Sequence, residues 1–201
     1  MNYLVGDIGN TFIKISILNK DFTIKKSFSI ETKRIFKKKY LTLFFKKFNS
    51  NNLNSNILFS SVVPSAYNKI KKFLVKKKFK VFEVKDFDIK KLIKINIKNF
   101  DQLGSDRIVN SIGSKKNKNI LIIDFGTATT FDIVKRGAYD GGVIAPGVNL
   151  SIINLKKSTA LLPLLKLQHQ QKNYGKNTKE ALNAGFLWGY EGLVNNIINK
   201  I

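Results

Sequence analysis

The sequence contains no cysteine, one histidine and one tryptophan among its 201 residues. Without cysteine it forms neither a disulfide bond nor a thiolate metal site. No apolar run approaches the roughly 18 residues that a membrane-spanning helix needs. The first residues, 1–7, lack the basic region that begins a secretory signal. We therefore expect a soluble, cytoplasmic protein with no membrane partner.

Two common nucleotide-binding motifs are also missing. No G-x-x-x-x-G-K-[ST] segment occurs, because Gly175-Lys176 is followed by Asn177 and has no glycine at the required upstream position. No G-x-G-x-x-G segment occurs either. A P-loop nucleotidase or a Rossmann-type oxidoreductase therefore has no support in the sequence.

Acidic residues are scarce: 13 Asp and Glu stand against 36 Lys and Arg, for a formal net charge of +23. The arginines are Arg34, Arg107 and Arg136, and all other basic residues are lysine. Base and phosphate recognition by nucleic-acid-binding proteins usually uses arginine. Lys, Asn, Ile and Phe all have AT-rich codons, so genome composition explains the lysines. We expect no specific nucleic-acid partner, although the charge should attract anionic substrates.

Apolar residues make up 43% of the chain, which is enough for a packed core. Hydrophobic periodicity indicates an α/β protein, with one large or two small domains. The predicted strands cover residues 2–7, 12–18, 22–29, 57–61, 81–84, 120–124, 129–135 and 141–144. The predicted helices cover residues 31–49, 64–77, 101–114, 148–157 and 178–199, the third of them capped by Asp101.

One short pattern occurs twice. Residues 4–11 and 122–129 both contain a strand, an Asp, a Gly two positions later and then Thr, and β-patterned residues follow each. A strand–turn–strand unit in each half indicates a duplicated α/β domain with a cleft between the halves. We expect an N-terminal domain over residues 1–100 and a C-terminal domain over residues 101–201.

The first turn, Asp7 to Thr11, has the residues that a phosphate-binding hairpin needs. Gly9 lets the backbone approach a ligand closely. Turn amides and the hydroxyl of Thr11 can donate hydrogen bonds to phosphate oxygens. Asp7 at the strand end can hold a cation beside the phosphates, and Lys14 can offset their charge. An ordinary tight hairpin would explain one such turn, but its recurrence at Asp124 to Thr130 favours phosphate handling.

A third candidate is the segment 103–110, where Asp106 and Arg107 stand at the start of a predicted helix. The pair could be no more than a charge pair on a solvated helix, since the helix dipole favours Asp there. Alternatively, the carboxylate could accept a proton from a substrate hydroxyl while the guanidinium binds an acidic substrate.

Taken in order, five motifs resemble those of the type III pantothenate kinases. The motifs are Asp7-x-Gly-Asn-Thr-x-x-Lys14, Gly104-x-Asp-Arg107, Asp124-x-Gly-Thr-Ala-Thr-Thr130-x-Asp132, Gly141-Gly-x-Ile-x-Pro-Gly147 and Gly175-Lys-Asn-Thr178. The resemblance spans nearly the whole chain. It implies duplicated ribonuclease H-like domains of the actin-like ATPase type, with mixed sheets. It also implies ATP-dependent phosphorylation of pantothenate to 4′-phosphopantothenate, the first step of coenzyme A biosynthesis.

The resemblance also implies roles for single residues. Asp7, Gly9, Asn10, Thr11, Lys14 and Thr127 would bind ATP, with Mg²⁺ near Asp7. Gly104, Ser105, Asp106, Arg107 and Thr178 would bind pantothenate, with Asp106 as the proton acceptor and thus the catalytic residue. Asp124 would bind a monovalent cation, K⁺ or NH₄⁺. The implied assembly is a homodimer.

Two departures from the family pattern stand out. The family has a tyrosine that contacts pantothenate where this chain has Ile97, and family members continue beyond the position of Ile201. We therefore expect a C-terminal domain shortened at its end. The alternative function is a non-catalytic relative that acts as a basic nucleic-acid-binding or regulatory protein.

Overall fold

The computed structural model describes residues 1–48, 52–114, 118–169 and 173–201. The chain divides into two compact units. The first comprises Met1–Ile120 and Val134–Asp140, and the second comprises Leu121–Ile133 and Gly141–Ile201. The duplication and the division at residue 100 stay predictions.

The first unit contains a five-stranded sheet of order β3-β2-β1-β4-β5. Its strands are β1 (Asn2–Ile8), β2 (Phe12–Leu18), β3 (Ile24–Glu31), β4 (Leu53–Ser61) and β5 (Lys80–Glu83). The central strand β1 pairs antiparallel with β2 and parallel with β4. The sheet is therefore mixed, and the prediction of an α/β fold with mixed sheets is confirmed.

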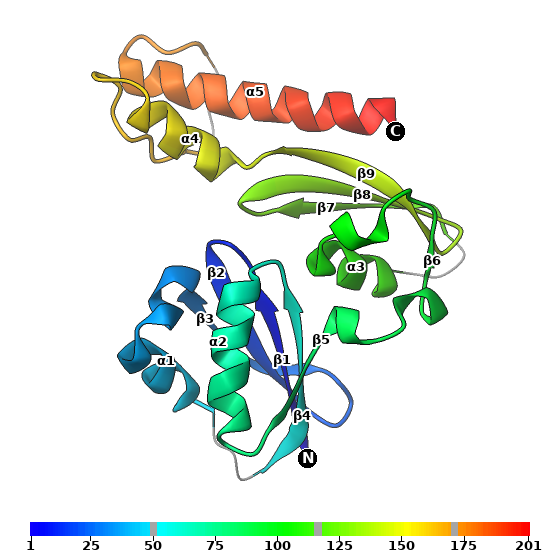
Figure 1. The fold of residues 1–201 in the computed structure, drawn as a ribbon. Helices are drawn as coiled ribbons and strands as arrows, with labels where there is room; N and C mark the ends of the chain where they lie inside the picture. Colours follow the sequence, from blue (N-terminus) through cyan, green and yellow to red (C-terminus); the bar gives the residue numbers. More distant parts are fainter. Residues whose placement is uncertain (49–51, 115–117, 170–172) are drawn as a thin grey trace. The chain divides into compact units, whose positions relative to one another are not determined.

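Alternation of apolar side chains determines which face of this sheet is covered. Ile13 and Ile15 of β2 are buried. Phe12, which precedes them, and Lys14, which lies between them, are exposed. The buried face packs against α1 (Lys38–Phe45) and α2 (Pro64–Val75), which lie on one side of the sheet (Figure 1). The opposite face carries Phe12, Lys14 and Asp7, all of them exposed.

The helix predicted at 31–49 is wrong in part. A 3₁₀ helix, η1 (Thr32–Phe36), precedes α1, and Lys37 between them is extended with φ −88° and ψ 119°. Apolar side chains continue across this break, so their spacing alone does not reveal it. The last predicted position, residue 49, lies outside the described residues.

A second apolar cluster lies in the later part of the first unit. The elements in this part of the chain are, in order, η3 (Val84–Asp86), η4 (Ile89–Lys91), β6 (Lys94–Ile95), η5 (Phe100–Gln102) and α3 (Ser105–Ile112). The buried members include Leu103, Ile108 and Tyr139. The predicted Asp101 cap is wrong, because α3 begins later, with Gly104 at its N-cap position.

A four-stranded sheet of order β6-β9-β8-β7 follows. Its long strands are β7 (Ile120–Phe125), β8 (Ala128–Lys135) and β9 (Ala138–Pro146). Helices α4 (Val148–Lys157) and α5 (Thr178–Lys200) belong to the second unit, and Figure 1 shows α4 beside the first part of α5. On α5, Ala184 is buried, whereas Trp188 is 44% exposed. None of the helices in the described parts of the chain is both long and apolar enough to cross a membrane.

Candidate active site

The first predicted turn joins β1 to β2 as a tight hairpin. The N–H of Gly9 donates to the carbonyl of Phe12 at 3.0 Å, and Asp7 lies opposite Lys14 in the antiparallel register. Side chains of such a pair lie on the same face of a sheet. Both are exposed, so one carboxylate and one ammonium group stand together on the open face beside the turn.

Thr32 holds this turn from the end of β3. Its hydroxyl donates to the carbonyl of Gly9 at 2.6 Å, and its backbone N–H donates to the carbonyl of Thr11 at 2.9 Å. Thr32 is 4% exposed, so water competes little for these bonds. The turn is thus anchored at two of its carbonyl groups.

A short chain of contacts connects β1 to the start of α3. The N–H of Val62, just after β4, donates to the carbonyl of Ile8 at 3.1 Å. A Cβ atom built on Gly104 would lie 3.4 Å from a methyl carbon of Val62. Because β1 and β4 are parallel, their carboxyl ends meet at one edge of the sheet, which is where α/β folds usually bind ligands. The two predicted phosphate and substrate segments therefore meet at this edge, within the first unit.

The Asp106 carboxylate lies over Gly104. A Cβ on Gly104 would come within 2.4 Å of its Oδ1 atom, so only glycine leaves room for the carboxylate in this position. The same oxygen accepts a hydrogen bond from the N–H of Arg107 at 2.8 Å. Asp106 is half-buried, and Ser105 beside it is 2% exposed. The carboxylate is thus held in one orientation at the start of α3.

The Arg107 guanidinium lies over the ring of Tyr139, with 5.8 Å between its central carbon and the ring centroid. Tyr139 is buried in the second apolar cluster, and Ile97 packs against the same cluster. The residue at the family's tyrosine position therefore serves as a partly buried apolar contact. Stacking on Tyr139 limits the directions in which Arg107 can reach an acidic ligand.

The second predicted turn lies in the second unit, between β7 and β8. Asp124, Gly126 and Thr127 are exposed, and the N–H of Gly126 donates to the carbonyl of Ala128 at 3.0 Å. Gly147 packs directly on this turn: its N–H donates to the carbonyl of Thr127 at 3.2 Å, and a Cβ there would lie 2.3 Å from the same oxygen. Gly147, directly after β9, thus supports the turn through close backbone packing.

Tyr190 of α5 braces the same region. Its hydroxyl donates to the carbonyl of Pro146 and lies 3.4 Å from the hydroxyl of the buried Thr129. This bond ties the long helix to the end of β9, directly before Gly147. Sequence reasoning gave Tyr190 no role, because the contact depends on the packing of α5.

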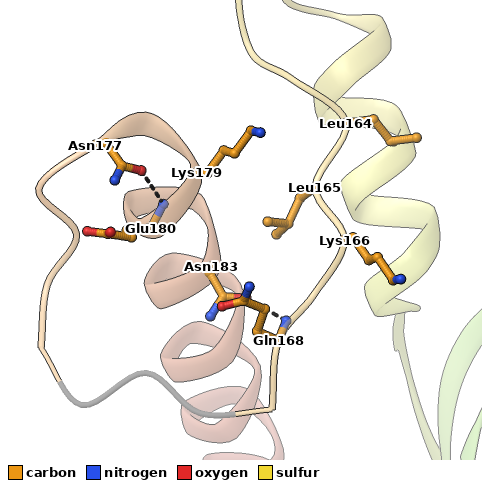
Figure 2. A pocket seen from close by; sticks show the side chains of 8 residues that line it. All are labelled: Leu164, Leu165, Lys166, Gln168, Asn177, Lys179, Glu180 and Asn183. Atoms are coloured by element: carbon orange, nitrogen blue, oxygen red, sulfur yellow. Dashed lines mark hydrogen bonds between the residues drawn. The ribbon is translucent and has the colours of Figure 1, made fainter.

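Thr178 is the exposed first residue of α5. The preceding Asn177 caps the helix, since its side chain accepts from the N–H of Glu180 at 3.0 Å. A pocket of about 420 Å³ adjoins this end of the helix (Figure 2). It is lined by Leu164, Leu165, Lys166, Gln168, Asn177, Lys179, Glu180 and Asn183. Thr178 therefore stands between two of the lining residues, Asn177 and Lys179.

No group of three Asp, Glu, His or Cys side chains that could hold a metal occurs among residues 1–48, 52–114, 118–169 and 173–201. Mg²⁺ in phosphoryl-transfer enzymes is commonly held by one or two carboxylates, with phosphate oxygens and water completing its shell. An exposed carboxylate at a strand end, such as that of Asp7, fits this requirement. Asp124 offers a similar single carboxylate in the second unit.

Comparison with known proteins gives the family. The family model described as type III pantothenate kinase matches residues 3–200. The type III pantothenate kinase of Pelagibacter ubique is 45% identical over 98% of this chain and 80% of its own length. That of Fusobacterium nucleatum is 34% identical over 97% of this chain and 80% of its own length.

Solved structures agree on the fold. A conserved Baf family protein from Campylobacter jejuni has a TM-score of 0.60 at 20% identity, over 96% of this chain and 78% of its own. The ethanolamine utilization protein EutJ from Carboxydothermus hydrogenoformans has a TM-score of 0.50 at 10% identity, over 100% of this chain and 72% of its own. The structure is therefore of the mixed-sheet α/β class that these proteins share. Within that class, the chain belongs to the type III pantothenate kinase family.

Proposed function

We propose that this protein transfers the γ-phosphoryl group of ATP to the primary hydroxyl of pantothenate, the first step of coenzyme A biosynthesis. The observation that carries the proposal is the chain of contacts from Ile8 through Val62 to Gly104. It brings the Asp7 strand end and the Asp106 helix start to one edge of the sheet. Phosphoryl transfer uses groups that hold the phosphates and a group that orients the attacking hydroxyl and accepts its proton.

Positioning and charge neutralisation carry most of phosphoryl transfer. We assign ATP binding to Asp7, Gly9, Asn10, Thr11 and Lys14, with Lys14 offsetting phosphate charge. We also assign Thr127 to ATP binding. Asp7 would hold Mg²⁺, which would supply further charge neutralisation at the phosphates.

The acceptor side uses the start of α3. Asp106 takes the proton of the pantothenate hydroxyl, and its bond from the Arg107 N–H keeps the carboxylate oriented for that step. Arg107 binds the pantothenate carboxylate, and Gly104, Ser105 and Thr178 complete the pantothenate contacts. A positioned base of this kind contributes about 10²–10⁴-fold to a rate.

The remaining assignments concern the monovalent cation, the cellular location, the assembly and the origin of the fold. Asp124 binds a monovalent cation, K⁺ or NH₄⁺, and the protein acts in the cytoplasm as a homodimer. The turn that occurs in both units supports an origin by duplication of a ribonuclease H-like domain. The family relationship favours the enzyme over a nucleic-acid-binding or regulatory relative.

The direct test is a phosphorylation assay with the purified full chain, ATP, Mg²⁺ and K⁺. Pantothenate and a panel of other small hydroxy acids serve as acceptors, and mass spectrometry identifies the product. We expect 4′-phosphopantothenate, with lower turnover when Na⁺ replaces K⁺. Phosphorylation of another hydroxy acid, with pantothenate left unchanged, would contradict the substrate assignment.

A further inference from the structure

Thr32 lies outside the family motifs and contacts the first turn directly. It bonds the turn twice, through its hydroxyl to the carbonyl of Gly9 and through its backbone N–H to the carbonyl of Thr11. It lies at the start of η1, where the chain leaves β3. Replacing its side chain leaves its backbone N–H in place, so the two bonds can be separated by mutation.

The Gly9 carbonyl determines the direction of the next amide. In a trans peptide the carbonyl of one residue and the N–H of the next lie in one plane and point in opposite directions. The hydroxyl of Thr32 holds the Gly9 carbonyl at 2.6 Å, so the N–H of Asn10 must point away from Thr32. Thr32 is buried and Asn10 is exposed, so this N–H is directed away from the buried core.

We propose that Thr32 is a positioning residue for nucleotide binding: its hydroxyl fixes the peptide between Gly9 and Asn10 so that the Asn10 amide meets an ATP phosphate oxygen. The inference rests on the proposed function. Thr32 itself touches neither nucleotide nor acceptor. Its contribution lies in ordering the turn before ATP arrives, which lowers the entropic cost of binding.

The matched pair of variants is Thr32→Val and Thr32→Ser. Valine keeps the shape and removes the hydroxyl, whereas serine keeps the hydroxyl and removes a methyl group. A net hydrogen bond corresponds to about a three- to tenfold change in an equilibrium constant. We expect Thr32→Val to raise both the dissociation constant and the KM for ATP by about that factor. The KM for pantothenate should change less than about twofold, and Thr32→Ser should restore ATP binding.

Thr159→Val is the control, because the Thr159 hydroxyl, just after α4, also donates to a backbone carbonyl, that of Leu155 at 2.8 Å. It should leave the KM for ATP unchanged. ATP binding is measured by titration calorimetry on the full chain and kinetics by coupled assay, with thermal unfolding as the check on folding. Should Thr32→Val fail to fold, Thr32→Ala, which adds no bulk, replaces it in the comparison with serine.

Three results would overturn the inference: ATP affinity unchanged in Thr32→Val, equal changes in the KM values for ATP and pantothenate, or no recovery in Thr32→Ser. A wild-type protein that binds ATP but phosphorylates no acceptor would contradict the proposed function instead. In that case the calorimetric comparison of the Thr32 variants still decides the role of this hydroxyl.

Discussion

Replacing Gly104 with alanine would place a methyl group where the Asp106 carboxylate lies. The new Cβ would stand 2.4 Å from Oδ1, whereas ordinary contact begins at 3.4 Å. The carboxylate must therefore move by about 1 Å, or the backbone must shift. The moved oxygen would also lose its 2.8 Å bond from the N–H of Arg107.

A displacement of this size at a reacting group costs roughly 10²-fold in rate. We expect Gly104→Ala to lower kcat for pantothenate by about that factor, while the KM for ATP stays close to that of the wild type. The melting temperature should change little, because the clashing atom is the end of a side chain rather than backbone. The assay is steady-state phosphorylation of pantothenate at saturating ATP, with thermal unfolding measured in parallel.

Gly113→Ala at the other end of α3 is the matched control. There a Cβ would meet its nearest neighbours at 3.4 and 3.7 Å, which is ordinary contact. Its kcat should equal that of the wild type. If Gly104→Ala kept full kcat with an unchanged melting temperature, the placement of the Asp106 carboxylate would have no part in catalysis and the reasoning would be refuted.

Three further predictions concern the turns and the core. Gly147→Ala should lower the melting temperature and raise the KM for ATP, because its Cβ would clash with the backbone oxygen of Thr127 at 2.3 Å; unchanged values of both would contradict the packing described. Lys14→Met should weaken ATP binding by roughly tenfold or more, as expected for a lost charge-assisted contact, and calorimetry measures it. Burial raises the pKa of Tyr67 above its ordinary value of 10.0, so the folded state favours the protonated phenol, and the resulting stability is lost as the pH rises through the raised pKa. Between about pH 8 and about pH 11, the melting temperature of Tyr67→Phe should therefore fall less than that of the wild type. An equal fall in both proteins would contradict the raised pKa of Tyr67.

Local patterns in the sequence predicted the strands that frame the site. Alternation in residues 12–18 gave β2, and the recurring Asp-x-Gly turn gave the pairs β1–β2 and β7–β8. These features arise from residues that are close in the sequence. Alternation of apolar residues and the residue types found in turns therefore predict them. Asp101 does not cap α3, because it lies inside the 3₁₀ turn η5, whose own cap is Asn99. The sequence does not show that this short turn ends before α3 begins.

Contacts between distant segments could not be predicted. Nothing in the sequence shows that Val62 lies between Ile8 and Gly104, or that the Thr32 hydroxyl reaches the Gly9 carbonyl. Such contacts use backbone groups and ordinary apolar side chains, which carry no motif. They decide how the motif residues come together, and so they determine the geometry of the candidate site.

The most direct test of the central claim compares the kcat of Asp106→Asn with that of Asp101→Asn, an exposed carboxylate just before the same helix. We predict that Asp106→Asn keeps wild-type affinity for ATP and loses about 10²–10⁴-fold in pantothenate phosphorylation, whereas Asp101→Asn matches the wild type. Equal turnover by Asp106→Asn and the wild type would contradict the account.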